Sequence, residues 1–246
     1  MHTVKPSFIR EILKAASSAG TLSMAGGLPR EELFPTEALL GAVERVMRDR
    51  GPSALQYAAT PGDLGLREWI AARLSEVHGV ATEADEIIIT TGSQQGIDVC
   101  GKLFSDGSVV MEEPGYLGAI LAMQANRVPI VPIPTTPAGP DLLRLEEAFS
   151  SGARLFYGMS RFQNPRGATY SRRAAEGIAD LLERYDAWMV EDDPYGDISF
   201  DGVSAEVLGK ADRPRAGEST AISALLPERV IYLGSFSKSI APSLRL

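Results

Sequence analysis

Cysteine and histidine are nearly absent from this sequence of 246 residues. The single cysteine, Cys100, excludes an internal disulfide and favours a reducing compartment, so we expect a cytoplasmic protein. The two histidines, His2 and His78, lie far apart and lack the spacing of metal ligands. We therefore expect no metal site and no histidine-based catalytic triad.

Long apolar runs and an excess of basic charge are also absent. No run approaches the roughly 18–20 apolar residues that a membrane span needs, and the first ten residues lack the apolar segment of a signal peptide. Lysine and arginine number 24 against 32 aspartate and glutamate residues, which gives a net charge of −8. Nucleic acids and anionic membranes favour a basic surface, so we expect neither as a partner.

From residue 85 onward, short β-rich runs alternate with amphipathic stretches. This pattern predicts an α/β fold with a mostly parallel central sheet flanked by helices. The expected strands are Glu86–Thr90, Ser108–Glu112, Val128–Ile133, Ala153–Tyr157, Ala187–Glu191 and Arg229–Leu233. Prolines cannot donate ladder hydrogen bonds, so Val128–Ile133 is expected at a sheet edge. The expected helices are Gln94–Phe104, Leu117–Asn126, Asp141–Phe149 and Ser171–Arg184.

The first 80 residues have a different pattern. Helices are expected at Ser7–Ala16, Thr36–Arg50 and Leu64–His78, joined by turn-rich segments. We predict that residues 1–50 form an N-terminal arm and that residues 51–246 form the major domain. Residues 201–228, rich in glycine and proline, are predicted to be a long surface loop.

Three candidate site segments follow expected strands, where this architecture binds its ligands. Ser93 and Gln94 open a helix whose free N–H groups suit an anion, although Ser93 is equally consistent with a plain N-cap. Tyr116 is placed to stack on a planar ring, or is a core tyrosine. Asn164 stands in an Asn-Pro turn that either presents its amide to a ligand or is purely structural.

Two further segments carry charge at strand ends. The three carboxylates at 191–193 suit a metal, a cation such as a pyridinium, or simply a solvated acidic loop. Lys238 follows an apolar strand and becomes nucleophilic if burial or a nearby cation lowers its pKa; otherwise it is an ordinary surface lysine. Around it, the side chains suited to holding a phosphate are Ser235, Ser237 and Arg245.

In this order and approximate spacing, the segments resemble the class I/II aminotransferases, which are fold-type I enzymes dependent on pyridoxal 5'-phosphate (PLP). The nearest resemblance is to the 2-aminoadipate, aromatic and branched-chain subgroup. It spans essentially the whole chain and is carried by Ser7–Lys14, Ala25–Pro29, Leu55–Tyr57, Thr91–Gly96, Gln163–Pro165, Asp192–Tyr195, Ser235–Lys238 and Arg245. The sequence departs from the family at Ser160, Arg166 and Ser243, where the family usually has proline, threonine and glycine.

The resemblance implies PLP as the cofactor and a role for each residue. Lys238 forms the Schiff base and moves a proton, and Asp192 pairs with the pyridine nitrogen. Tyr195 and Asn164 hydrogen-bond the ring oxygen, and Tyr116 stacks on the ring. The phosphate ligands are Ser93, Gln94, Ser235, Ser237, Arg245 and, reaching into the partner subunit of a homodimer, Tyr57. Gly27 lies against the substrate carboxylate.

Family members continue for well over a hundred residues beyond the last phosphate ligand. We therefore expect a fold-type I large domain that is incomplete at its C-terminal end, with the C-terminal small domain missing. The expected reaction is transfer of an amino group between an L-amino acid and a 2-oxo acid. The alternatives are a non-catalytic remnant that still binds PLP, a PLP-dependent lyase or decarboxylase, and a PLP-sensing regulatory module. The acidic balance of the chain disfavours the last, which in its relatives carries a basic DNA-binding domain.

Overall fold

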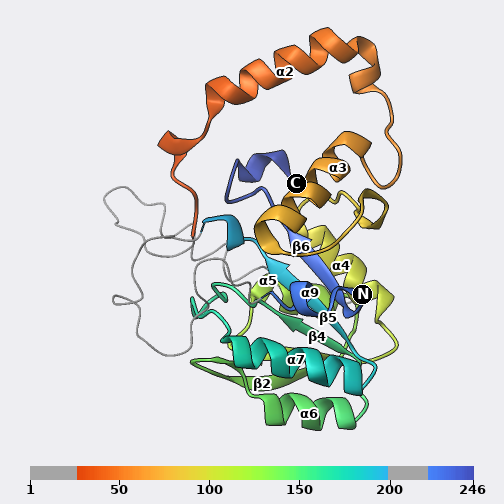
Figure 1. Cartoon of the computed structure of the whole chain (residues 1–246), viewed down its shortest axis with the longest axis vertical. Helices are drawn as coiled ribbons and strands as arrows, with labels where there is room; N and C mark the ends of the chain where they lie inside the picture. Colours follow the sequence, from red (N-terminus) through yellow and green to blue (C-terminus); the bar gives the residue numbers. More distant parts are fainter. Residues whose placement is uncertain (1–26, 199–220) are drawn as a thin grey trace, which may run out of the picture. The chain divides into compact units, whose positions relative to one another are not determined.

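The computed structural model describes residues 27–198 and 221–246 (Figure 1). The predicted helix Ser7–Ala16 and most of the predicted loop at 201–228 lie outside the described residues. The chain divides into two compact units, residues 1–44 and 45–246. In the described part of the first unit, a 3₁₀ turn, η1 (Glu31–Leu33), precedes α2 (Thr36–Arg50), which spans the boundary. The predicted division at residue 50 stays a prediction.

The second unit is built on a sheet with the strand order β3-β2-β1-β4-β5-β6 (Figure 1). Its strands are β1 (Val109–Glu113), β2 (Ile130–Thr136), β3 (Gly139–Pro140), β4 (Leu155–Gly158), β5 (Trp188–Asp193) and β6 (Val230–Gly234). All pairs are parallel except β2 with β3. The predicted α/β fold with a mostly parallel sheet is confirmed.

Helices cover both faces of this sheet. The α-helices of the second unit are α3 (Leu64–Arg73), α4 (Ser93–Leu103), α5 (Leu117–Ala125), α6 (Leu142–Ser150), α7 (Arg172–Arg184) and α9 (Ile222–Leu225). A π-helical turn, η3 (Leu74–His78), continues α3. Short 3₁₀ turns are η2 (Gly51–Leu55), η4 (Ala84–Glu86), η5 (Gly196–Ile198), η6 (Pro227–Arg229) and η7 (Pro242–Leu244).

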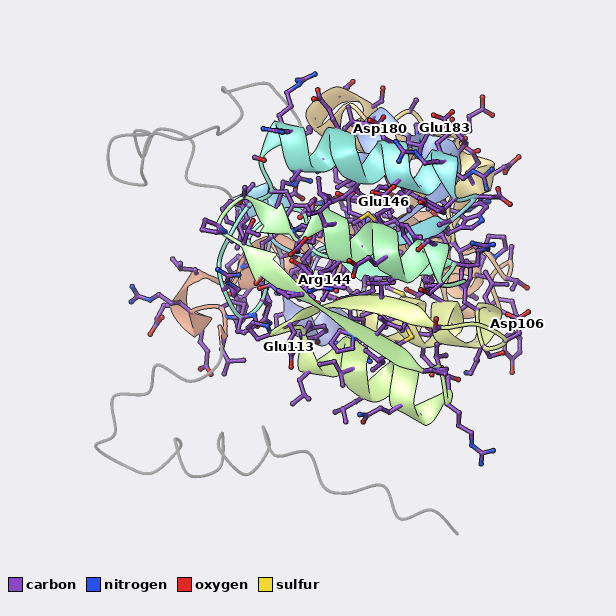
Figure 2. The ribbon with its side chains drawn as sticks, turned by 90° about the horizontal axis from the view of Figure 1, so that it is seen from below. Asp106, Glu113, Arg144, Glu146, Asp180 and Glu183 are labelled. Carbon is purple, nitrogen blue, oxygen red and sulfur yellow. The ribbon has the colours of Figure 1, made fainter. Side chains whose placement is uncertain are left out.

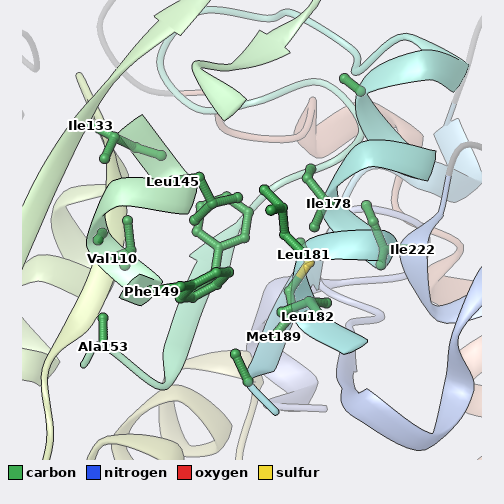
Figure 3. Close-up of a cluster of buried hydrophobic side chains, with 14 of the residues drawn as sticks. Val110, Ile133, Leu145, Phe149, Ala153, Ile178, Leu181, Leu182, Met189 and Ile222 are labelled. Atoms are coloured by element: carbon green, nitrogen blue, oxygen red, sulfur yellow. The ribbon is translucent and has the colours of Figure 1, made fainter. Parts of the chain in front are cut away.

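The core has two layers because successive strand residues point to opposite faces of a sheet. Val110 belongs to the cluster under α6 and α7, whereas its neighbours Val109 and Met111 belong to the cluster under α4 and α5. Figure 3 shows the first cluster, in which Phe149 and Leu182 are fully buried. This cluster packs α6 and α7 against the sheet and so holds the strands in place. The candidate site lies at the ends of these strands.

The outer surface of α6 and α7 is polar. Arg144 and Glu146 on α6, and Asp180 and Glu183 on α7, are labelled on this side of the molecule in Figure 2. Arg184 on α7 forms an ion pair of 2.8 Å with Glu146. A charged helix surface facing water is the usual outer layer of an α/β domain, whereas ligands of such domains bind at the carboxyl ends of the strands.

Two predictions are wrong. Residues 86–90 do not form a strand: Ile87–Thr90 pair with no strand of the described chain, the Ile89 N–H donates to the Pro61 carbonyl at 2.8 Å, and Ile88 is 69% exposed. A run of isoleucines has β propensity, but a strand also needs a partner in register. Residues 221–228 are not surface loop, because Ile222 begins α9 and is buried in the core.

Candidate active site

The N-terminus of α4 forms one end of the candidate site. Gly92 occupies the N-cap with φ +72°, and as a glycine it offers no side chain to the first N–H groups of the helix, which begins at Ser93. The Arg245 guanidinium donates to the Thr91 carbonyl at 3.3 Å. The positive φ of Gly92 favours glycine, and a Cβ there would lie 2.8 Å from Arg245 Nη2 and would displace the end of that side chain. A helix N-terminus and a guanidinium therefore converge at one place.

Two hydroxyl groups come from the loop that also carries Arg245. Ser235 and Ser237 follow β6, and their Oγ atoms lie 3.0 Å apart. The Ser237 N–H donates to Ser235 Oγ at 3.1 Å, and the Ser235 hydroxyl donates to the Leu246 carbonyl at 3.1 Å. Hydroxyls, a guanidinium and helix N–H groups together are the donor set that a phosphate dianion needs.

Gln94 and Tyr116 connect this end to the middle of the site. The Gln94 side-chain amide donates to the Gly118 carbonyl at 3.0 Å, which ties α4 to the segment that begins α5. Tyr116, the N-cap of α5, is half-buried. Burial raises the pKa of its phenol, nearby Asp192 and Tyr195 raise it further, and Arg245 lowers it. Tyr116 thus lies within electrostatic reach of both ends of the candidate site.

Asp192, near the carboxyl end of β5, is 1% exposed. Its Oδ2 accepts a hydrogen bond of 2.6 Å from Tyr157 on the neighbouring strand β4. Its Oδ1 is buried and has no hydrogen-bond partner among the described residues. Burial raises the pKa of this carboxyl to about 6, the Tyr157 hydrogen bond opposes that rise, and the charge of Asp193 adds to it. A buried carboxylate oxygen without a partner fits a cationic N–H donor such as a pyridinium.

Tyr195 and Asn164 complete the middle of the site. The Asn164 amide hydrogen-bonds the Tyr195 phenol, whose pKa is raised by burial and by nearby Asp192. The two side chains come from the loops that follow β4 and β5, which are adjacent parallel strands. Their polar groups are therefore brought to the same edge of the sheet as Asp192, as the strand-end pattern predicts.

Lys238 lies in the turn that follows β6 and is partly buried, which lowers the pKa of its amine. Its loop is packed against α3, because the Phe236 ring lies 6.0 Å from the Trp69 ring, centroid to centroid. Desolvation without loss of access is the environment that makes a lysine nucleophilic near neutral pH. Lys238 thus belongs to the same loop after β6 as the serine and arginine donors.

Two further predicted site residues are Tyr57 and Gly27. Tyr57 follows η2 and is 99% exposed, with its N–H donating to the Gln56 side chain at 2.8 Å. Full exposure is compatible with a contact to a second subunit, but the predicted contact stays a prediction. Gly27 is the first described residue and belongs to the other compact unit, so its predicted role also stays a prediction.

Four polar residues beside the site are absent from the sequence-based prediction. Tyr157 reaches Asp192 directly, Arg161 and Tyr232 contact the adjacent Asp193, and His78 contacts Arg161. The only signals in the sequence were the positions of Tyr157, Arg161 and Tyr232 in or just after expected strands and of His78 at the end of an expected helix, which do not say which groups meet. The Tyr157 hydrogen bond, for example, depends on the register of two strands 35 residues apart.

Within residues 27–198 and 221–246, no helix is both long and apolar enough to cross a bilayer. Over the same ranges, no three side chains of histidine, cysteine, aspartate or glutamate are grouped so as to hold a metal ion. Cys100 is buried in α4, where burial raises the pKa of its thiol to about 11, as expected of an unreactive core cysteine.

Comparison with known proteins gives the family. The family model described as "Aminotransferase class I and II" matches residues 28–243. The 2-aminoadipate transaminase of Thermus thermophilus is 39% identical over 246 residues, which cover 99% of this chain and 58% of that protein. The kynurenine aminotransferase of Pyrococcus horikoshii, solved in complex with PMP, has a TM-score of 0.85 at 34% identity and covers 98% of this chain.

A third relative holds a compound related to the predicted cofactor. The α-aminoadipate aminotransferase of Thermus thermophilus, solved with N-(5'-phosphopyridoxyl)-L-leucine, has a TM-score of 0.79 at 37% identity and covers 98% of this chain. The chain spans 57–58% of the length of these three relatives. Because the family model matches well over half of the chain, this protein belongs to the class I and II aminotransferase family.

Proposed function

We propose that this chain carries the cofactor half of a PLP-dependent aminotransferase, which transfers an amino group between an L-amino acid and a 2-oxo acid. The observation that carries the proposal is the unpaired, buried Oδ1 of Asp192 near the carboxyl end of β5, next to β6, whose following loop carries phosphate-type donors. Membership of the family supports it. The chain spans 58% of its first relative, so the activity and substrates of a whole protein are part of the proposal.

The phosphate of PLP is assigned to the donors at the α4 end. Ser93 and Gln94 offer backbone N–H groups at the helix N-terminus, Arg245 supplies a positive charge, and Ser235 and Ser237 supply hydroxyls. In a partly buried site, charge-assisted hydrogen bonds of this kind are about twice as strong as neutral ones. These residues anchor the cofactor without taking part in proton transfer.

The ring of PLP is assigned to the middle of the site. Asp192 accepts the pyridinium N–H on its unpaired oxygen, Tyr195 and Asn164 hydrogen-bond the ring oxygen, and Tyr116 stacks on the ring. When bound, PLP supplies an electron sink for the bond broken at the substrate Cα, and it does so best when its ring nitrogen is protonated. Asp192 keeps that proton in place.

Lys238 is assigned the covalent attachment of the cofactor aldehyde and the movement of the substrate proton. Both roles need a neutral amine, and burial lowers the pKa of Lys238 in the direction that favours one. We assign Gly27 to the substrate carboxylate, and Tyr57 to the phosphate of a partner subunit in a homodimer. A cytoplasmic location fits the single, buried cysteine.

Addition of PLP followed by borohydride reduction tests the proposal. We expect a visible absorbance band on addition of PLP, and a pyridoxyl adduct on Lys238 after reduction, detected by mass spectrometry of peptides. Lys238→Ala should abolish the adduct, whereas Lys102→Ala should retain it, because Lys102 is exposed and paired with Asp98 at 2.6 Å. A folded wild-type protein that forms no adduct at Lys238 contradicts the proposal.

The type of reaction needs a second measurement. An amino acid added to the PLP-loaded protein should give the matching 2-oxo acid and the pyridoxamine form of the cofactor in equal amounts. Loss of carbon dioxide, or of a side-chain group, would instead identify a decarboxylase or a lyase. Adduct formation without any turnover of amino acids would identify a binding remnant.

A further inference from the structure

Three consecutive carboxylates at the end of β5 have three different environments. Glu191 accepts hydrogen bonds from the Ile222 and Ser223 N–H groups at 3.0 and 2.9 Å. Asp193 forms an ion pair with Arg161. Asp192, between them, keeps one oxygen without a partner among the described residues. Glu191 and Asp193 are therefore fully engaged, and only the middle carboxylate is left open to a ligand.

The negative charge of Asp193 disfavours the ionised form of Asp192. Its side chain is 0% exposed, so water does not screen its charge from the adjacent Asp192. Two neighbouring buried carboxylates repel each other, and the charge of Asp193 does raise the pKa of Asp192. Unless Asp193 is neutralised, Asp192 is more easily protonated, and a protonated carboxyl cannot pair with a pyridinium.

Three donors compensate Asp193. Arg161 Nη2 donates to Oδ2, the Tyr232 hydroxyl donates to the same oxygen at 2.8 Å, and the Gly196 N–H donates to Oδ1 at 2.9 Å. Of these three donors, only Arg161 brings a positive charge. It comes from the loop that follows β4 and leads to Asn164, so it lies beside the ring site without belonging to it.

His78 holds the guanidinium in place from the end of η3. Arg161 Nη1 and His78 Nδ1 lie 3.0 Å apart, and because a guanidinium cannot accept a hydrogen bond, Nδ1 must be the acceptor. Nε2 then carries the hydrogen and donates to Asp197 Oδ1 at 3.0 Å. Arg73 from α3 pairs with the same oxygen at 2.9 Å. The ring of His78 is buried, so the guanidinium has little freedom to turn away.

We propose that Arg161, held by His78, is a positioning residue that neutralises Asp193 and so keeps Asp192 available to the cofactor ring nitrogen. The inference rests on the proposed function for its ligand, and it concerns residues that touch neither cofactor nor substrate. This role explains why a charged arginine lies in a mostly buried position of the loop after β4. Its ion pair with Asp193 links that loop to the carboxylates at the end of β5.

The first test is the affinity for PLP, measured by absorbance titration. Arg161→Met keeps the length of the side chain but removes its charge. It should weaken PLP binding by about tenfold, because the uncompensated charge of Asp193 then favours the protonated form of Asp192. Arg161→Lys should recover part of the loss. The matched control is Arg172→Met, which removes an exposed arginine paired with Glu176 on α7 and should leave the affinity unchanged.

The decisive variant is the double substitution Arg161→Met with Asp193→Asn. If Arg161 acts by cancelling the charge of Asp193, removing that charge should restore PLP affinity in the double variant. If Arg161 acts only as packing, the double variant should bind no better than Arg161→Met. Unchanged affinity in Arg161→Met alone, or no recovery in the double variant, overturns the inference.

Unfolding of the protein without PLP separates this inference from the proposed function. Between about pH 5 and pH 8 the urea midpoint should fall in both proteins, and it should fall further in Arg161→Met than in the wild type. The reason is that the uncompensated carboxylates of the variant become charged in this range. The double variant should lose this extra fall. A wild-type protein that binds no PLP would refute the proposed function, while the pH dependence of the midpoints would still decide whether Arg161 compensates Asp193.

Discussion

At the scale of single residues, Asp192 shows how a buried carboxylate reduces stability. Burial, followed by the charge of Asp193, holds its pKa at about 6 in the folded protein, above the ordinary value of 3.8, despite the Tyr157 hydrogen bond. The folded state therefore binds more protons than the unfolded state between these values, and stability falls as the pH rises through this range. The cost is fully present above about pH 6, where it amounts to roughly 3 kcal/mol.

We predict that Asp192→Asn stabilises the protein without PLP. The amide cannot ionise, so at about pH 8 the free energy of unfolding should rise by ~1–3 kcal/mol, and at about pH 4 the difference should largely vanish. Urea unfolding at both values measures this. Saturating PLP should reverse the order of the two proteins, because a bound pyridinium stabilises only the carboxylate. Equal stability of both proteins at both pH values would show that Asp192 is not a strained carboxylate.

At the scale of elements, α7 illustrates how a local sequence signal supports the core. Ser171 is the N-cap, and its Oγ accepts the Ala174 N–H at 3.1 Å. Ser171→Ala should lower the free energy of unfolding by about 1 kcal/mol, because a free N–H at the first turn is then left buried. Urea unfolding measures the loss. Ser151→Ala, at the exposed C-terminal end of α6, is the control and should change the stability much less.

The elements that sequence predicts well are those with local start and stop signals. The predicted helix Ser171–Arg184 differs from α7 only at its cap, and the expected strands at 108–112 and 229–233 are each shifted by one residue from β1 and β6. In each case apolar periodicity and a capping or turn residue agree. The prediction of a strand at residues 86–90 was wrong, because a strand needs a partner strand and no local sequence signal shows whether one is present.

The site follows the same division. Ligands bind at the carboxyl ends of parallel strands, so the sequence alone predicted that the segments carrying Asp192, Tyr195 and Asn164 lie together. The residues that prepare Asp192 were not predictable, because His78 meets Asp197 across 119 positions and Arg161 meets Asp193 across 32. Such contacts depend on the order of the strands and on the packing of the helices, and these cannot be derived from local sequence patterns.

At the scale of the whole molecule, the exposure of Tyr57 raises the question of a second subunit. The side chain is 99% exposed, although a tyrosine normally buries most of its ring. A homodimer in which each Tyr57 hydrogen-bonds the phosphate in the other subunit would give this residue a partner. Tyr57→Phe should then weaken PLP binding by about tenfold, the expected loss for a hydrogen bond to a charged group.

Mixing two variants that are each impaired in PLP binding tests the shared site directly. In a hybrid dimer of Lys238→Ala and Tyr57→Phe, one site contains the intact Lys238 of one copy and the intact Tyr57 of the other. Random exchange of subunits should therefore restore about one quarter of all sites to wild-type affinity, since half the dimers are hybrids with one repaired site each. Absorbance titration of the mixture with PLP should show these sites of wild-type affinity, which neither variant shows when it is titrated alone. If Tyr57 serves its own subunit, the mixture should titrate as the sum of its parents; sedimentation showing a monomer would contradict the shared site altogether.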